Sequence, residues 1–413
     1  MTRRAQISKH DRLVLRPLAG RVAELASRAI EDEKRNLWYG HNALQPTRPL
    51  IFCDPENGWG EILTPDEMQC EGELAREWEW HLRREVFWGE RMRDDRVIEP
   101  FFNVGYVAET TDWGMHETKR GGESGGSYVW DAPLADFTDM DKLRFPSVNV
   151  DGGKTQDLVD LAEATFGDLL SVRVKTSWFW SVGLTYPLVN LRGLEQIMWD
   201  MLDCPGDLHR LMAFLRDGTA SFLDSLENNG WLSINNDGTY VGSGGFGWTN
   251  ELPQEDFSGH VRLRDCWGFA ESQETVAISP DMFAEFVIPY QLPLMERFGL
   301  NCYGCCEPLD KRWHVVKRIP RLRRVSVSAW ADLHTMAECL QDNYIFSWKP
   351  NPSHLAMPEF DEDLIRRTLR EGFSIGKGCR MEAIMKDCHT IGGDPRRATE
   401  WVRIAKEEAE RVD

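Results

Sequence analysis

The sequence predicts an α/β fold in which a parallel sheet closes as a barrel. From Asp151 onward, short apolar segments alternate with helical segments, the order expected when parallel strands are joined by helices. The 413 residues suffice for one large α/β barrel or for two domains. Hydrophobic residues make up 42% of the chain and charged residues 28%, as in an ordinary globular protein.

The first part of the chain predicts helices around one buried strand. Residues 8–40 have apolar residues at helical spacing and predict a helix interrupted by Pro17. The apolar residues 50–53 follow a turn with two prolines and predict a short strand. Residues 71–95 predict a strongly charged helix with an aromatic underside, and residues 98–151 predict irregular structure.

The second part predicts the alternating elements of the barrel. The expected strands are residues 170–176, 231–235, 298–303, 323–328 and 344–348. The expected helices are residues 191–201, 207–228, 280–298 and 311–318, with others that begin near Asp332, Asp361 and Pro395. Pro289 and Pro293 kink the helix at 280–298, and Asp394 with Pro395 forms a typical helix start.

Charge and cysteine usage exclude several classes of function. The net charge of −19 argues against nucleic acid and anionic membranes as partners, because both bind basic patches. The ten cysteines are scattered and do not form a small disulfide framework. The N-terminus has no apolar stretch typical of a secretory signal, and no apolar window approaches the roughly 20 residues of a membrane span. We therefore expect a reduced, cytoplasmic protein.

The run Tyr303-Gly304-Cys305-Cys306-Glu307 is the most informative motif of the chain. It joins two thiols and a carboxylate at a predicted strand end, and a third thiol stands downstream at Cys388. Two sulfur ligands with an oxygen or nitrogen ligand are typical of an open zinc site. The alternative interpretation is that these are buried free cysteines, which are common in protein cores.

Other polar and aromatic residues also follow predicted strands, where active sites of α/β barrels collect. The expected mouth of the barrel contains Trp178, Trp180, Asn235, Asp237, Tyr240, Gln273 and Lys349. Tryptophans at strand ends suit a flat pocket for an aromatic ring, although most of the seventeen tryptophans are expected to be packing residues. Each polar residue also has a structural interpretation: Asp237 stabilises a glycine turn and Lys349 is solvated.

The pattern from Trp267 onward resembles the uroporphyrinogen decarboxylase superfamily, in particular its corrinoid-associated methyltransferase branch. The resemblance is carried by residues 272–274, 303–309, 324–332, 347–352 and 392–395. The turn Asn236-Asp237-Gly238-Thr239 looks like the acidic Asp-x-Gly turn of that superfamily. The likeness covers roughly residues 128–410.

This resemblance implies a TIM (β/α)8 barrel at residues 128–413 with an N-terminal helical extension at residues 1–127. In the methyltransferase branch, a His-x-Cys after one strand and a distant Cys hold catalytic zinc. The resemblance therefore implies zinc ligands from Cys305 or Cys306 and from Cys388. Tyr303 stands where the family has histidine, so Glu307 is expected as the replacement ligand and His389 as an alternative.

The expected function is a zinc-dependent methyltransferase that takes a methyl group from a methoxylated aromatic substrate and passes it to a corrinoid protein. Glu307 and Asp237 are the expected catalytic residues. The alternatives are methyl transfer to a thiol of the coenzyme M type, a metal-free decarboxylase, and a non-enzymatic corrinoid- or ligand-binding module. The decarboxylase alternative lacks N-terminal arginines: residues 40–60 offer Arg48, with Asp54 and Glu56 nearby. The sequence is compatible with a homodimer.

Overall fold

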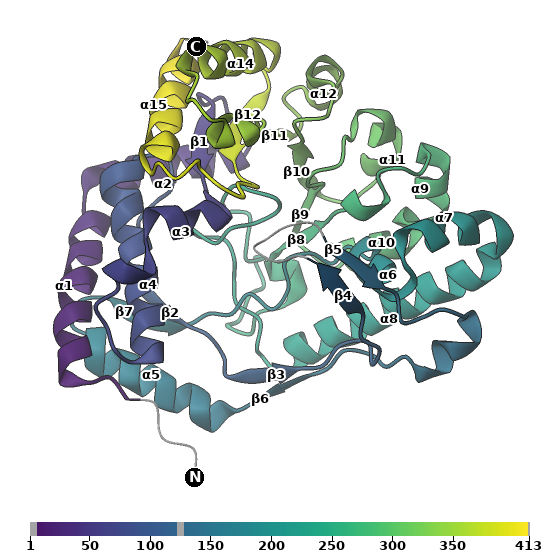
Figure 1. The fold of residues 1–413 in the computed structure, drawn as a ribbon, viewed down its shortest axis with the longest axis horizontal. Coiled ribbons are helices and arrows are strands. Elements are labelled where there is room, and N and C mark those ends of the chain that lie inside the picture. The colour runs from purple at the N-terminus through teal and green to yellow at the C-terminus, as the bar shows by residue number, and fades with distance from the viewer. Residues whose placement is uncertain (1–5, 122–127, 412–413) are drawn as a thin grey trace.

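A six-stranded parallel sheet forms the centre of the protein, in the order β1-β12-β11-β10-β9-β8 (Figure 1). The computed structural model describes residues 6–121 and 128–411. The strands of this sheet are β1 (Leu50–Cys53), β8 (Trp267–Ala270), β9 (Leu300–Tyr303), β10 (Leu322–Val327), β11 (Ile345–Trp348) and β12 (Arg380–Met385). Most of their residues are buried, as expected for a parallel sheet covered on both faces. The predicted α/β class is confirmed.

Three further strand pairs lie outside this sheet. They are the parallel pair β2 (Phe101–Val104) and β7 (Ser171–Val174), and the antiparallel pairs β3 (Ala108–Thr110) with β6 (Val148–Val150) and β4 (Thr118–Gly121) with β5 (Tyr128–Asp131). The central sheet and the β2–β7 pair together contain eight parallel strands. In the described part of the chain, the backbone ladders do not join these eight strands into one sheet.

Side chains cover both edges of the six-stranded sheet. At the β8 edge, Asn235 Nδ2 donates to the carbonyl of Trp267 (3.0 Å) and Asn235 Oδ1 accepts from its N–H (2.8 Å). At the β1 edge, Asp95 donates its backbone N–H to the carbonyl of Ile51 (2.8 Å), and its carboxylate accepts from the Ile51 N–H (2.8 Å). These pairs of bonds replace those of a neighbouring strand. The strand expected at 231–235 is therefore absent as a strand, because Asn235 binds the sheet through its side chain.

Helices surround the sheet and the β2–β7 pair (Figure 1). The longer helices are α1 (Lys9–Ala26), α2 (Ala29–Asn42), α4 (Glu73–Phe87), α5 (Gly152–Phe166), α6 (Thr185–Arg192), α7 (Leu194–Asp203), α8 (Pro205–Asn228), α9 (Pro280–Phe286), α10 (Ile288–Met295), α12 (Leu333–Leu340), α14 (Glu362–Ile375) and α15 (Arg396–Glu410). Short helices are α3 (Trp59–Ile62), α11 (Trp313–Val316) and α13 (Ser353–Ala356). A π-helical turn, η3 (Trp88–Met92), extends α4.

Most expected helices are present, with different boundaries. The helix predicted at 8–40 is divided into α1 and α2 between Ala26 and Ala29, while Pro17 lies inside α1. The helix predicted at 280–298 is divided into α9 and α10. Asp332 is an N-cap: its carboxylate accepts from the Thr335 N–H (2.7 Å).

Residues 1–127, expected as a helical extension, also supply the strands β1 to β4 within their described part, and β1 and β2 belong to parallel pairings. The region predicted as irregular, residues 98–151, contains β2 to β6. No described helix combines the length and the apolar character that a membrane crossing requires.

A glycine-rich loop, residues 241–248, is buried along its whole length between the strands. A Cβ at Gly242 would lie 2.9 Å from Cys302 Cβ, and one at Gly244 would lie 2.8 Å from Ile384 Cγ2. Gly244 also has a φ of +135°, which side-chain-bearing residues rarely adopt. Because β9 and β12 both contact this loop, it fills space inside the fold and reaches the strand ends from within.

A buried ionic network supports the same loop. Arg324 Nε donates to Glu382 Oε1 (2.9 Å), and the other Glu382 oxygen lies 3.1 Å from His41 Nε2. Arg324 Nη2 donates to Asn42 Oδ1 (2.7 Å). Burial disfavours the Glu382 charge, but Arg324 and the His41 hydrogen bond outweigh it and lower the Glu382 pKa to about 2. The network ties α2 to β10 and β12.

Candidate functional site

The carboxyl ends of β9, β10, β11 and β12 surround a cavity of about 430 Å³, called here the thiol cavity. It is lined chiefly by Cys305, Cys306, Trp330, Lys349, Asn351, Asp387, Cys388 and His389. The two cysteine segments are more than 80 residues apart in the chain. They come together because β9 and β12 belong to one parallel sheet, whose strands all end at the same edge.

The three thiols differ in exposure. Cys305 and Cys388 are buried, whereas Cys306 is exposed. Cys305 Sγ lies 3.5 Å from Cys306 Sγ, and Cys306 Sγ lies 3.5 Å from Asp387 Oδ2. Cys388 Sγ is directed at the carbonyl of Lys386 (3.7 Å). The pair and the carboxylate of Asp387 thus form the closest group of soft and hard donors in this cavity.

Of the three thiols, Cys305 is the one whose pKa the site lowers. The hydrogen bond from Cys306 lowers the pKa of Cys305 below its ordinary value, against burial, and Lys386 and Ser243 act in the same direction. Ser243, from the glycine-rich loop, donates its hydroxyl to Cys305 Sγ (3.2 Å). Burial raises the pKa of Cys388. Cys305 is therefore the thiol best prepared to act as a thiolate.

Lys386 links the polar groups around the cavity. Its Nζ lies 3.4 Å from Asp387 Oδ1, 3.5 Å from Glu56 Oε1 and 3.5 Å from Ser243 Oγ. Burial disfavours the ammonium, but Tyr240 and Asp387 outweigh it and raise the pKa of Lys386. The residue order did not single out Lys386 because nothing in the sequence shows that residues 56, 243 and 386 meet.

Lys349, predicted as a substrate ligand, lines the thiol cavity but is buried. Its Nζ donates to Ser347 Oγ (2.6 Å) and to the carbonyl of Ser347 (2.9 Å). Burial lowers the pKa of Lys349 to about 8, with Glu382 acting against the shift. The alternative interpretation, in which Lys349 is exposed to solvent, is wrong because the side chain is buried.

Glu307 is directed away from the thiols. It is 1% exposed, and its Oε1 accepts from the Ser272 N–H (2.9 Å) while its Oε2 accepts from the Cys305 N–H (2.9 Å). It does not belong to the lining of the thiol cavity. Both oxygens thus hold the loop after β9 against the loop after β8, a structural position rather than that of a free ligand.

Tyr303, at the place where the resemblance implies histidine, also points away from the cavity. Its hydroxyl donates to Gln291 Oε1 (3.0 Å) on α10, and the side chain is fully buried. Neighbouring side chains of a strand face opposite sides, so Cys302 faces the glycine-rich loop and Tyr303 faces the helices. No metal ligand is expected from residue 303 in this arrangement.

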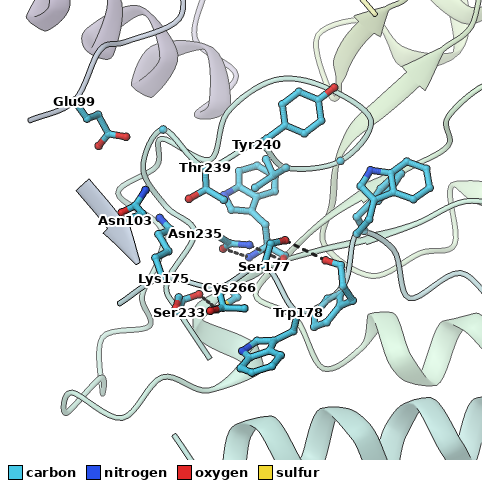
Figure 2. A pocket seen from close by; sticks show the side chains of 18 of the residues that line it. Glu99, Asn103, Lys175, Ser177, Trp178, Ser233, Asn235, Thr239, Tyr240 and Cys266 are labelled. Atoms are coloured by element: carbon cyan, nitrogen blue, oxygen red, sulfur yellow. Dashed lines mark hydrogen bonds between the residues drawn. The ribbon is translucent and has the colours of Figure 1, made fainter. Parts of the chain in front are cut away.

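A second cavity of about 390 Å³, called here the aromatic cavity, lies at the ends of β7 and β8 (Figure 2). Its walls include Phe101, Trp178, Phe179, Trp180, Tyr240 and Phe269. Of the predicted substrate residues, Trp178, Trp180, Asn235 and Tyr240 line it. Trp180 is 47% exposed, so it is not a packing residue behind the sheet. Asn235 already uses its amide on Trp267.

Asp237 and Gln273 lie elsewhere. Asp237 accepts two bonds from Lys175 Nζ (2.7 and 2.6 Å) and lines a neighbouring cavity of about 640 Å³. Burial opposes its ionisation, but Lys175 outweighs burial and lowers the pKa of Asp237. Gln273 Nε2 contacts Glu274 Oε1 (3.4 Å) and belongs to the lining of neither main cavity. Neither residue stands among the thiols.

The two main cavities are neighbours. Lys386 Nζ lies 6.0 Å from the ring centre of Trp180, and the Trp180 ring packs edge-on against Phe269 (5.0 Å). Among the described residues, the buried Tyr240 hydroxyl finds no hydrogen-bond partner. Lys386, which contacts Asp387 beside the thiols, therefore also lies near Trp180 of the aromatic cavity.

A zinc ion requires donor atoms of suitable type at a defined spacing. Ligand atoms of one tetrahedral zinc lie about 3.5–3.8 Å apart when the bonds are about 2.1–2.3 Å long. The Cys305–Cys306 and Cys306–Asp387 separations, both 3.5 Å, agree with that spacing. Within residues 6–121 and 128–411, however, no three His, Cys, Asp or Glu side chains converge as a complete metal-binding group. The donor types fit zinc; Glu307 does not belong to them.

The fold and the site together define an α/β protein with a thiol-rich cavity at the carboxyl edge of its parallel sheet. No family model matches the chain, and a search of curated proteins returns no match.

Proposed function

We propose that this protein is a cytoplasmic, zinc-dependent methyltransferase that removes a methyl group from a methoxylated aromatic substrate and passes it to a corrinoid protein. The observation that carries the proposal is that Cys305, Cys306 and Cys388 line one cavity beside an aromatic-walled cavity. Reaction centre and substrate pocket are then adjacent, as a transfer between two bound partners requires.

The proposal includes a closed (β/α)8 barrel. The eight parallel strands follow one another in chain order from β1 to β12, and the last pairs with the first. At the two open edges of the six-stranded sheet, residues 95 and 235 occupy the hydrogen-bonding positions of a further strand. This succession supports a barrel of the uroporphyrinogen decarboxylase type whose ladder is interrupted beside β1 and β8.

The zinc ligands proposed are Cys305, Cys306 and Cys388, with Asp387 in place of Glu307. Cys388 would have to turn from the Lys386 carbonyl, at which its Sγ is directed, to join the other three. A zinc ion held there would supply Lewis-acid stabilisation of the ether oxygen as the methyl group leaves. Ser243 donates to Cys305 Sγ and so holds one donor in place. Lys386 balances the charge of Asp387 and Glu56 at the border between the cavities. Trp178 and Trp180 offer flat surfaces for the ring.

The decarboxylase alternative is not favoured by the N-terminal charges. Arg48, the arginine that the sequence offers for a carboxylate substrate, donates to both carboxylate oxygens of Asp95 (2.8 and 2.7 Å). Asp54 and Glu56 at the end of β1 add negative charge. A polycarboxylate substrate would meet repulsion there.

Methyl transfer from methoxyarenes to cobalt(I) cobalamin tests the proposal. Zinc-loaded protein should convert a methoxyarene to the phenol and form methylcobalamin in equal amounts. Cys305→Ser should abolish this turnover, whereas Cys339→Ser, outside both main cavities, should leave it unchanged. Absence of methylcobalamin across a panel of methoxyarenes, with zinc bound, would reject the function.

A further inference from the structure

The aromatic cavity contains one carboxylate that the protein itself does not satisfy. Glu99 precedes β2 and lines the cavity on the same side as Asn103 and Lys175 (Figure 2). In the described residues, no hydrogen bond or ion pair reaches its carboxylate, and its pKa is set by burial and by charges that do not contact it. A buried or half-buried carboxylate normally finds a partner, so this one is available to a ligand.

The cations near Glu99 are all directed at other acceptors. Arg96 donates to both oxygens of Glu85 (2.8 and 2.6 Å), and Lys175 donates to both oxygens of Asp237. Arg173 donates to Asn103 Oδ1 (2.6 Å) and pairs with Asp237 (3.1 Å). Within the described residues, none of these three cations donates to Glu99.

The charges of this group nevertheless balance. Arg96 and Glu85 neutralise each other. Lys175 and Arg173 both pair with Asp237, which leaves one positive charge. Glu99 offsets this charge without contacting it. Burial, followed by repulsion from Asp237, raises the pKa of Glu99 to about 7. A cationic ligand would add a net positive charge to this group. A neutral hydrogen-bond donor would satisfy the carboxylate and leave the net charge of the group unchanged.

The walls define the rest of the ligand. Trp180, Phe101 and Phe269 line the same cavity, which has the size of a small ring compound. Trp178 is fixed by stacking on Tyr106 (5.6 Å) and by its N–H bond to the carbonyl of Trp231 (2.8 Å). These surfaces are preorganised for the faces of an aromatic ring.

We infer that Glu99 accepts a hydrogen bond from a neutral hydroxyl group on the aromatic ligand, so that the cavity selects hydroxylated methoxyarenes over fully methylated ones. The inference rests on the proposed function for the identity of the methoxy group. Gly238 makes room for the carboxylate, because a Cβ there would lie 2.2 Å from Glu99 Oε2.

Calorimetric binding without zinc or corrinoid tests the inference. The probes are the three methoxyphenol isomers and the matching dimethoxybenzenes. At about pH 8.5, above the pKa of Glu99, at least one methoxyphenol should bind about tenfold more tightly than its dimethoxybenzene, the size expected for a hydrogen bond to a charged acceptor. Glu99→Gln keeps only an uncharged, weaker acceptor and should reduce the preference. Glu109→Gln, which replaces an exposed glutamate on β3, should retain it.

A second variant approaches the same carboxylate from outside. Gly238→Ala should displace Glu99 and reduce the preference as Glu99→Gln does. An unchanged preference in Glu99→Gln, tighter binding of a methoxybenzylammonium than of any methoxyphenol, or no binding of these rings would overturn the inference. Since neither zinc nor cobalamin is present, failed methyl transfer with a retained phenol preference would reject the proposed function alone.

Discussion

The carboxylate of Glu307 accepts two backbone N–H groups in a fully enclosed position, and this decides what its replacement does. Glu307→Gln places an amide N–H2 against one of these donors and leaves it unsatisfied. We expect a loss of about 1–3 kcal/mol in the free energy of unfolding, measured by urea denaturation. The Glu307→Gln variant should bind as much zinc as the wild type. A loss of zinc with unchanged stability would show that Glu307 is a zinc ligand.

Glu271 gives the protein a distinct dependence of stability on pH. Burial, Glu274 and Glu307 raise its pKa from 4.5 to about 9. Between these values the folded state holds a proton that the unfolded state releases, so stability present at low pH is lost as pH rises through this window. Glu271→Gln should flatten the decline between pH 5 and pH 9.

Thermal unfolding at several pH values measures this effect. The exposed Glu195→Gln serves as control and should keep the wild-type slope. A Glu271→Gln variant with the same slope as the wild type would show that Glu271 is ionised in the folded protein.

At the residue scale, chain order explains which side chains share a cavity. Cys305, Cys306 and Cys388 line one cavity because each follows a strand of one parallel sheet. The directions of Glu307 and Tyr303 could not be predicted, since they depend on the conformation of a short loop and on which face of β9 a residue occupies. The sequence did not indicate Glu99 as a binding residue, because its carboxylate is unpaired only since the neighbouring cations bind other acceptors.

At the scale of elements, the glycine-rich loop should be the most sensitive segment. A Cβ at Gly247 would lie 1.8 Å from the carbonyl oxygen of Asn235, which is backbone and cannot rotate away. Gly247→Ala should therefore destabilise the fold by more than about 2 kcal/mol. Gly20→Ala in α1, with open space around it, should be neutral or stabilising.

Chemical denaturation of both variants measures this difference. Equal stability of Gly247→Ala and the wild type would show that the loop does not pack inside the strands as described.

Elements were predictable when a short apolar run stood between turns. The strand predicted at residues 50–53 is β1 itself, and β9, β10 and β11 agree with prediction within one or two residues. β12 was missed because Arg380 and Glu382 interrupt its apolar run, and Glu382 is buried only because Arg324 neutralises it. β8 was missed because Gly268 weakens the strand pattern; the Phe298 ring packs where a side chain would stand.

At the scale of the whole molecule, the sheet order explains the position of the thiol cavity. The ends of β9 to β12 lie at one edge of the six-stranded sheet, and the aromatic cavity lies between β8 and the separate β2–β7 pair. The sequence rhythm predicted the parallel sheet. The bonds at the two edges of this sheet could not be predicted, because they depend on the side chains of residues 95 and 235.

Zinc ligation is the central claim, and X-ray absorption at the zinc edge tests it most directly. Protein purified without chelators and supplied with one equivalent of zinc should show sulfur neighbours at about 2.3 Å. Cys305→Ser and Cys388→Ser should each lose sulfur neighbours, while Cys339→Ser should match the wild type. A zinc environment of oxygen and nitrogen alone, or one unchanged by replacing Cys305 and Cys388, would contradict the account.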